Sequence, residues 1–280
     1  MGERRIGHMF TIRQLLVDLS GGFDRYWFGG DPFKSAYHNA LSMSFPVGEQ
    51  FFIDSVRRAA SLLPLEIQAE FEPQVRGFAA QESTHRRIHS LYNQELEKQG
   101  LKNHWEIRAA RRIAFITKQH PFHGLAATAA LEHFTAVLGD WLIGNRDLLE
   151  QAPPALRDLW LWHASEETEH KTVAFDLYQA LGGSLAWRRR WFLIVGFNFT
   201  VDTWRQTINN LWHGGGLLRP STWFHAATFL VGRRGVIWGT VGALAKYLRA
   251  DFHPNQLGDP SQHEQWLAAN AHVYRVIGAK

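Results

Sequence analysis

Residues 159–178 read LWLWHASEETEHKTVAFDLY, a stretch of helical character with a high concentration of acidic residues and histidines. Glu167 and His170 stand three residues apart, so on a helix they share one face and can reach the same metal ion from adjacent turns. His163 stands four residues before Glu167 and falls on that face as well. The stretch therefore predicts a helix with metal ligands along one side.

A second Glu-x-x-His pair lies in residues 78–93, FAAQESTHRRIHSLYN, where Glu82 and His85 have the same spacing. One such pair is weak support for a metal site, because these pairs are frequent on exposed helix faces. Two pairs on separate helices are what a ferritin-like dimetal bundle requires, together with one glutamate from each of two further helices. The question is whether the chain supplies those two glutamates.

The first of them lies in residues 124–138, GLAATAALEHFTAVL, where only Glu132 and His133 are ionisable. The rest of this run is suited to burial. A lone buried carboxylate costs several kcal/mol unless it is paired or bound to a metal. Glu132 is therefore a strong candidate ligand.

The second lies in residues 44–56, SFPVGEQFFIDSV, for which we predict a helix that begins near Pro46. Glu49 then shares a face with Phe52 and Val56. An alternative role for Glu49 is to interact favourably with the positive end of its own helix.

Taken together, four predicted helices supply four carboxylates and two or three imidazoles. We expect Glu82 and Glu167 to bridge two metal ions, and Glu49 and Glu132 to be terminal ligands. Glu166 can also face this site, and His89 either supports a ligand or is a polar core residue. The predicted metal ligands are Glu49, Glu82, His85, Glu132, His163, Glu167 and His170.

The composition restricts the kind of metal site. The chain contains no cysteine, which excludes disulfides, thiolate nucleophiles, Cys-ligated zinc and iron–sulfur clusters. A mixed oxygen and nitrogen site favours iron or manganese over structural zinc. We expect two iron ions, with manganese or zinc as alternatives.

Helical signals recur along the chain, whereas strand signals are weak, so we predict an all-α protein: a ferritin-like four-helix bundle with additional C-terminal helices. The Gly182-Gly183 turn divides a bundle over residues 1–182 from a basic, aromatic-rich extension over residues 183–280. Proline and glycine place the helix breaks. The predicted helices are 46–63, 73–99, 104–118, 123–147, 154–181, 186–212, 222–249 and 261–275.

The C-terminal extension is basic and aromatic. Residues 187–249 contain nine Lys or Arg, one acid (Asp202) and twelve aromatic residues. We predict a hydrophobic or lipid-like substrate, with an acidic head as one option. Docking on a membrane surface is one alternative for this region, and a packed helical pair with a solvated basic face is the other.

Other partners and locations are constrained more loosely. No stretch has the length and freedom from charge of a membrane span, and no nucleic-acid recognition motif is present, so we expect no nucleic-acid partner. Residues 1–16, MGERRIGHMFTIRQLL, lack the apolar run and cleavage site of a signal peptide. We expect a cytoplasmic protein, with contact with the inner face of the membrane left open.

The motifs just quoted resemble a known family. Together with YLRADFHPN at residues 247–255, they resemble a bacterial family catalogued as predicted metal-dependent hydrolases, over nearly the whole chain. The order of ligands is also similar to that of the di-iron arylamine N-oxygenases of the p-aminobenzoate N-oxygenase type, which includes a His-x-x-x-Glu-x-x-His segment matched here by His163, Glu167 and His170. Outside the seven ligand positions this second match is not close, so amine substrates are not implied.

Three functions from different classes are compatible with this site. Our leading hypothesis is a di-iron oxygenase or oxidase that uses O2 and an electron donor on a hydrophobic substrate. The alternative is a dimetal hydrolase of an ester or phosphoester, although no separate general base or anion clamp is evident near the ligands. The third is a non-catalytic protein that stores metal or binds a lipid or partner.

Overall fold

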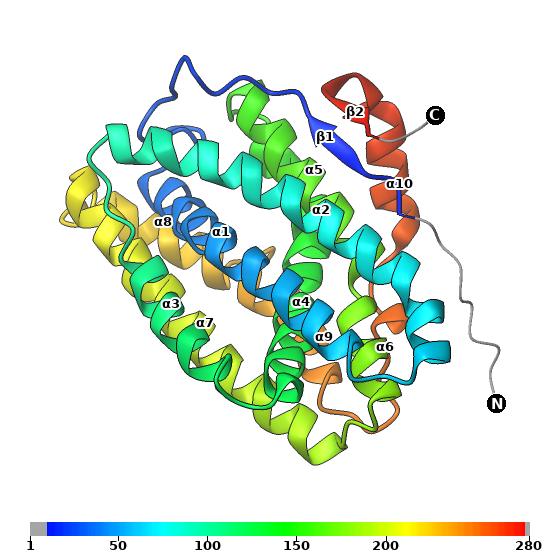
Figure 1. Cartoon of the computed structure of the whole chain (residues 1–280). Coiled ribbons are helices and arrows are strands. Elements are labelled where there is room, and N and C mark those ends of the chain that lie inside the picture. Colours follow the sequence, from blue (N-terminus) through cyan, green and yellow to red (C-terminus); the bar gives the residue numbers. More distant parts are fainter. Residues whose placement is uncertain (1–9, 278–280) are drawn as a thin grey trace.

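The computed structural model describes residues 10–277 and confirms the all-α class. Helices account for almost all of the regular structure in this range (Figure 1). Their bounds are α1 Pro32–Ala60, α2 Leu65–Lys98, α3 His104–Ile116, α4 Pro121–Gly144, α5 Pro154–His170, α6 Val173–Ala180, α7 Leu185–Gly214, α8 Pro220–Val231, α9 Val236–Lys246 and α10 Pro260–Ala269. Short 3₁₀ helices cover Arg146–Leu149, Pro254–Gln256 and Ala271–Val273.

The first helix corrects a prediction. It begins at Pro32 and not near Pro46, because the Asp31 carboxylate accepts hydrogen bonds from the backbone N–H of Phe33 and Lys34 and caps the new start. Pro46 therefore lies inside α1, and Glu49 is in the body of the helix. The alternative that Glu49 stabilises a helix N-terminus is wrong.

Side chains from outside the helix compensate for Pro46. Proline has no N–H for the carbonyl four residues earlier, which is that of Ser42. Nδ2 of Asn93 in α2 donates to this carbonyl at 3.0 Å, and Nδ2 of Asn103 donates to the next one, of Met43, at 2.8 Å. With these acceptors satisfied, the helix continues through the proline.

Other predicted bounds also change. α2 begins at Leu65 and not at 73, with Pro73 inside it. The predicted helix 154–181 divides at residues 171–172 into α5 and α6, directly after His170. The predicted helix 222–249 divides into α8 and α9. Gly232 follows the last residue of α8 and Gly235 precedes the first residue of α9, with two arginines between the two glycines.

Two strands near the two ends of the described range form a short sheet that the sequence did not predict. β1 (Arg13–Leu15) pairs antiparallel with β2 (Tyr274–Val276), so that Gln14 lies opposite Arg275. The predicted helix 261–275 ends at Ala269 for this reason. The prediction about a signal peptide concerns mainly residues 1–9, which lie outside the described residues.

Four helices surround the predicted ligands. α1 packs against α2 and α4, while α5 packs against α4 and α2, and all four appear together in Figure 1. α7 lies on α1 and α4, α8 packs on α1, and α9 packs on α4. The resemblance to a ferritin-like bundle and the division after residue 182 remain predictions. Buried apolar residues from both sides of that division, such as Phe33 and Phe229, belong to the same hydrophobic core.

Candidate metal centre

The seven predicted ligands come from four helices and are all buried. α1 contributes Glu49, α2 contributes Glu82 and His85, and α4 contributes Glu132. The remaining three, on α5, are His163, Glu167 and His170, and none of the seven is more than 4% exposed. Helical spacing places each Glu-x-x-His pair on the inward face of its helix, as predicted from the sequence.

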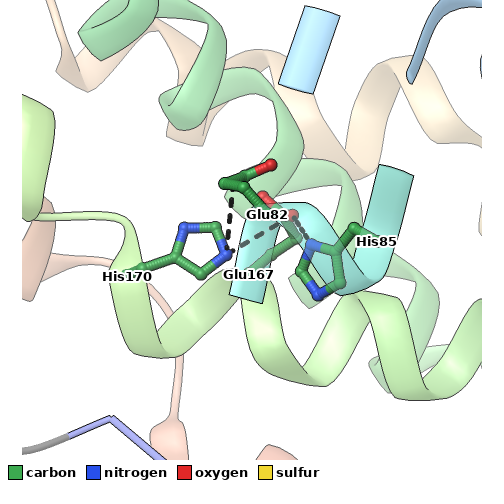
Figure 2. Close-up of side chains that lie close together, drawn as sticks. All are labelled: Glu82, His85, Glu167 and His170. Carbon is green, nitrogen blue, oxygen red and sulfur yellow. Dashed lines mark ion pairs between the residues drawn. The ribbon is translucent and has the colours of Figure 1, made fainter. Parts of the chain in front are cut away.

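Four of these residues form one compact group with ligand atoms within 4.8 Å of one another: Glu82, His85, Glu167 and His170. Figure 2 shows both imidazoles turned toward the carboxylates between them. Nδ1 of His85 lies 3.4 Å from Oε1 of Glu167, and Nε2 of His170 lies 3.5 Å from Oε1 of Glu82. Two carboxylates thus stand between two imidazoles, an arrangement suited to bridging cations.

A second buried group consists of Glu49, His89 and His163, whose ligand atoms also lie within 4.8 Å of one another. His89 was predicted to support a ligand or to be a polar core residue, and the structure places it beside two predicted ligands. The shared partner of the two groups is Glu167, whose Oε1 lies 2.9 Å from Nε2 of His163.

Glu132 reaches the centre through His170. Its Oε2 accepts a hydrogen bond from Nδ1 of His170 at 3.0 Å, which leaves Nε2 of that ring facing Glu82. The structure therefore places Glu132 next to the centre as the partner of an imidazole.

Glu166 and Arg13 hold the other imidazole. Oε2 of Glu166 accepts from Nε2 of His85 at 2.9 Å, and its Oε1 accepts from the Arg13 guanidinium at 3.1 Å. The proton on Nε2 leaves Nδ1 of His85 as the free ligand atom. The role of Arg13 was missed, because a residue of the N-terminal strand gives no local signal of contact with a helix more than a hundred residues away.

A hydrogen-bonded relay sets the protonation of His163. Nδ2 of Asn93 donates to the Ser42 carbonyl, so Oδ1 of Asn93 accepts from the Ser42 hydroxyl at 2.8 Å. The hydroxyl can then only accept from Nδ1–H of His89, at 2.9 Å, and Nε2 of His89 accepts from Nδ1–H of His163 at 2.6 Å. Nε2 of His163 then carries no proton and faces Oε1 of Glu167. Both atoms are hydrogen-bond acceptors, and two acceptors so close need a cation or a proton between them.

Burial keeps both histidines of this relay neutral. Desolvation lowers the pKa of His163 to about 4 and that of His89 well below its ordinary value. Neutral imidazole is the form that binds metals.

The carboxylates have pKa values that reflect crowding in a dry site. Burial raises the pKa of Glu132 to about 7 and that of Glu49 well above its ordinary value. For Glu82, burial and then the neighbouring carboxylates raise the pKa. For Glu167, burial also acts to raise the pKa, but the surrounding histidines outweigh it and hold the value well below the usual range.

The donor set fits metal ions. Among residues 10–277, no hydrogen-bond donor reaches either carboxylate oxygen of Glu49 or Glu82, Oε1 of Glu132 or Oε2 of Glu167, and Nδ1 of His85 and Nε2 of His170 also lack partners. Unpaired buried carboxylates are costly, and divalent cations relieve that cost. Two such ions balance the charge of the four predicted carboxylate ligands.

Two cavities reach the centre. The larger, of about 630 Å³, lies between α1, α3, α4 and α7 and touches Glu49 at the centre. Its walls are mainly aromatic and aliphatic, with Arg111, Arg112 and Arg190 among the lining residues. A smaller cavity of about 50 Å³ touches His163 and Glu167, and Phe45 lines both cavities.

Three further polar residues have their partners outside the centre. Asp176 pairs with His253 at 2.8 Å, and the His133 ring packs against Tyr247, 4.8 Å between centroids. The Tyr92 hydroxyl donates to Asn39 and lies beside the relay, with no contact to a predicted ligand among the described residues.

Fold and site together define an all-α protein with a buried Glu/His centre that could hold metal, next to an apolar cavity. Residues 11–258 match the family described as predicted metal-dependent hydrolase, and the chain belongs to that family. Searches of curated proteins and of solved structures gave no match. Within residues 10–277, no helix combines the length and apolar character needed to cross a bilayer.

Proposed function

We propose that this chain is a dimetal hydrolase that cleaves an ester or phosphoester of a hydrophobic substrate with an acidic group. The observation that carries the proposal is the set of buried carboxylate oxygens and imidazole nitrogens that lack hydrogen-bond partners among the described residues, beside the large apolar cavity. Membership of the family supports hydrolysis over the oxidation that we first expected from the ligand pattern.

The residues would divide the work as follows. Glu82, His85, Glu167 and His170 would hold one ion, and Glu49 and His163 would complete the site for a second. Bound divalent ions supply Lewis-acid polarisation of a carbonyl or phosphoryl oxygen and lower the pKa of water. Glu166 and Glu132 fix which nitrogen of each imidazole carries the proton.

The cavity would bind and orient the substrate. Aromatic walls such as Phe52 and Trp191 exclude water from the scissile bond, which strengthens electrostatic interactions there. Arg111 and Arg190 line the cavity and would bind the acidic group of the substrate, a role for which the sequence alone gave no candidate.

The test is hydrolysis by metal-free protein reloaded anaerobically with Zn(II) or Mn(II), with long-chain p-nitrophenyl esters and phosphoesters as substrates. We expect turnover that is lost in Glu167→Gln and retained in Glu169→Gln, because Glu169 contacts Arg13 and Gln81 and none of the predicted ligands. Absence of turnover with every ester and phosphoester would contradict the proposal.

A second candidate function is oxidation of the same substrate class with O2 and two iron ions. The observation that favours it is the all Glu/His donor set on four helices, without thiolate. Anaerobic loading with Fe(II) followed by O2 separates the two candidate functions. A transient optical or Mössbauer signal together with oxidation of the substrate would favour this candidate over hydrolysis.

A further inference from the structure

The longest C-terminal helix presents an apolar stripe to the outside. On α7, Leu193, Phe197, Trp204 and Trp212 are 60%, 69%, 45% and 65% exposed. Their spacings of four, seven and eight residues place them on one side of the helix. The opposite side of α7 is occupied, because it packs on α1 and α4.

The stripe continues onto α8, and α9 contributes a further exposed aromatic residue next to the end of α8. The Trp223 ring of α8 lies 6.3 Å from that of Trp204, centroid to centroid, and Phe224 beside it is 72% exposed. Trp238 of α9 is 64% exposed, and its Nε1 donates to the Val231 carbonyl at the end of α8. We call this surface the outer apolar face: Leu193, Phe197, Trp204, Trp212, Phe224 and Trp238.

Within residues 187–249, every exposed charged side chain is positive. Of the nine basic residues in 187–249, all of which the structure describes, eight are exposed and only Arg188 is buried. The one acid, Asp202, is buried and paired with Arg108 and Arg112 of α3. Two of the eight, Arg234 and Arg249, pair with Asp147 and Asp251 outside the segment. Within the segment itself no carboxylate faces solvent.

We propose that the outer apolar face docks on a lipid bilayer that carries anionic headgroups. Tryptophan and phenylalanine enter the boundary between headgroups and acyl chains, while arginines beside them meet lipid phosphates. On α7, Arg189 and Arg205 flank the stripe on either side by helical spacing.

A second copy of the chain is a poorer occupant of this face. A two-fold dimer would bring the same surface of both copies together, and basic residues would face basic residues with no acid of the segment between them. An anionic bilayer removes that repulsion and accommodates the apolar stripe at once.

The cavity opens beside the same face. Ile194 and Arg190 of α7 and Phe115 of α3 are exposed and also line the large cavity. α3 and α7 run next to each other in Figure 1. If the proposed function holds, docking places the cavity against the bilayer, from which an apolar substrate can enter; docking itself does not depend on that function.

The test is sedimentation of the full chain with vesicles of phosphatidylcholine alone and of phosphatidylcholine with phosphatidylglycerol, at low and high salt. We expect binding to the anionic vesicles that weakens at high salt. Phe197→Ser should reduce partitioning about tenfold, and Arg189→Gln with Arg205→Gln about fivefold per charge at low salt.

Matched controls lie on α1 and α2, outside the outer apolar face. Leu65→Ser removes a side chain that is 79% exposed on α2, and Arg57→Gln removes an exposed charge on α1; neither should change vesicle binding. Metal content and circular dichroism report whether each variant is folded and whether the metal centre is intact, separately from docking.

Two results would overturn the proposal. One is no sedimentation with anionic vesicles at low salt, or equal sedimentation of wild type and Phe197→Ser. The other is a concentration-dependent dimer, seen by analytical ultracentrifugation, that Phe197→Ser abolishes, since a second copy would then cover the face.

Discussion

At the scale of single residues, the candidate metal centre depends on which atom carries each proton. Glu166 accepts from Nε2 of His85, and Glu132 accepts from Nδ1 of His170, so each imidazole turns its other nitrogen toward the shared carboxylates. Ring nitrogens of three histidines lie close to Oε1 of Glu167. Of the four predicted carboxylate ligands, Glu167 is the one whose pKa is lowered. Protonation and the proposed metal binding would therefore be coupled at this site.

We expect metal affinity to increase with pH. In the metal-free protein, burial raises the pKa of Glu132 to about 7. Burial opposes the charge on His85, but the nearby Glu166 and Glu167 outweigh it and raise the pKa of His85 to about 10. A raised pKa means that a proton must leave before the group can bind, so affinity for Zn(II) or Mn(II) rises as pH passes through about 7 and continues to rise above it. Calorimetry in buffers of different ionisation enthalpy should also detect proton release; a pH-independent affinity without release would contradict this.

Glu166→Gln should weaken metal binding by about 10- to 100-fold, because the neutral amide is a poorer partner for Nε2–H of His85. Competition with a chelator of known affinity measures the change. Glu169→Gln is the control, since Glu169 also contacts Arg13 but does not contact His85. Equal loss in both variants would mean that Arg13, and not the orientation of His85, sets the affinity.

At the scale of elements, helix α1 shows how a proline is tolerated and then used. The Ser42 carbonyl that Pro46 leaves without a partner accepts from Asn93, and this contact orients Asn93 toward the Ser42 hydroxyl. The side-chain amide of Asn93 thus satisfies the carbonyl left free by Pro46 and is also the first member of the relay to His163. α4 and α5 also pack closely, at Gly139 of α4. A Cβ atom at this position would lie only 2.9 Å from the Ala164 carbonyl oxygen of α5, so a glycine is needed here.

Asn93→Ala should lower the free energy of unfolding by about 1–3 kcal/mol, because a buried carbonyl loses its donor. Adding Pro46→Ala restores an N–H for that carbonyl and should recover much of the stability. Metal affinity should remain low in the double variant, since the Ser42 hydroxyl still lacks its acceptor. Urea denaturation and chelator competition measure the two quantities; recovery of both, or of neither, would show that the relay and the helix defect are not linked in this way.

At the scale of the whole molecule, the centre is the meeting point of α1, α2, α4 and α5, and the cavity joins it to α3 and α7. Four carboxylates lie close together in a dry core, and among the described residues Glu49 and Glu82 have no hydrogen-bond donor on either oxygen, so the group works against folding unless cations are bound. The molecule should therefore be held together in part by its metal ions.

Removal of metal should lower the melting temperature of the whole chain. A ligand present at about 100 times its Kd stabilises the folded state by about 2.7 kcal/mol per site, so chelation should remove at least that much. Differential scanning calorimetry with and without chelator measures the shift. The double variant Glu82→Gln with Glu132→Gln lacks two of the negative charges, so chelation should change its melting temperature less. An unchanged melting temperature of the wild type after confirmed loss of metal would contradict this prediction.

The sequence by itself determined the all-α fold class and predicted seven candidate ligands. Two Glu-x-x-His pairs and two isolated glutamates are local patterns, and helical geometry alone fixes which face each side chain occupies. The structure brought all seven together in the core without exception. Whether each binds metal remains a prediction.

Only the tertiary structure decided the rest. The start of α1, the relay from Asn93 to His163, the contact of Arg13 with Glu166 and the closure of β1 on β2 depend on partners far apart in the chain. No local pattern encodes such partners, because which long-range contacts form depends on how all the helices pack at once. The cavity and the outer apolar face are likewise properties of the packed helices, since the same apolar residues would be core if another helix covered them.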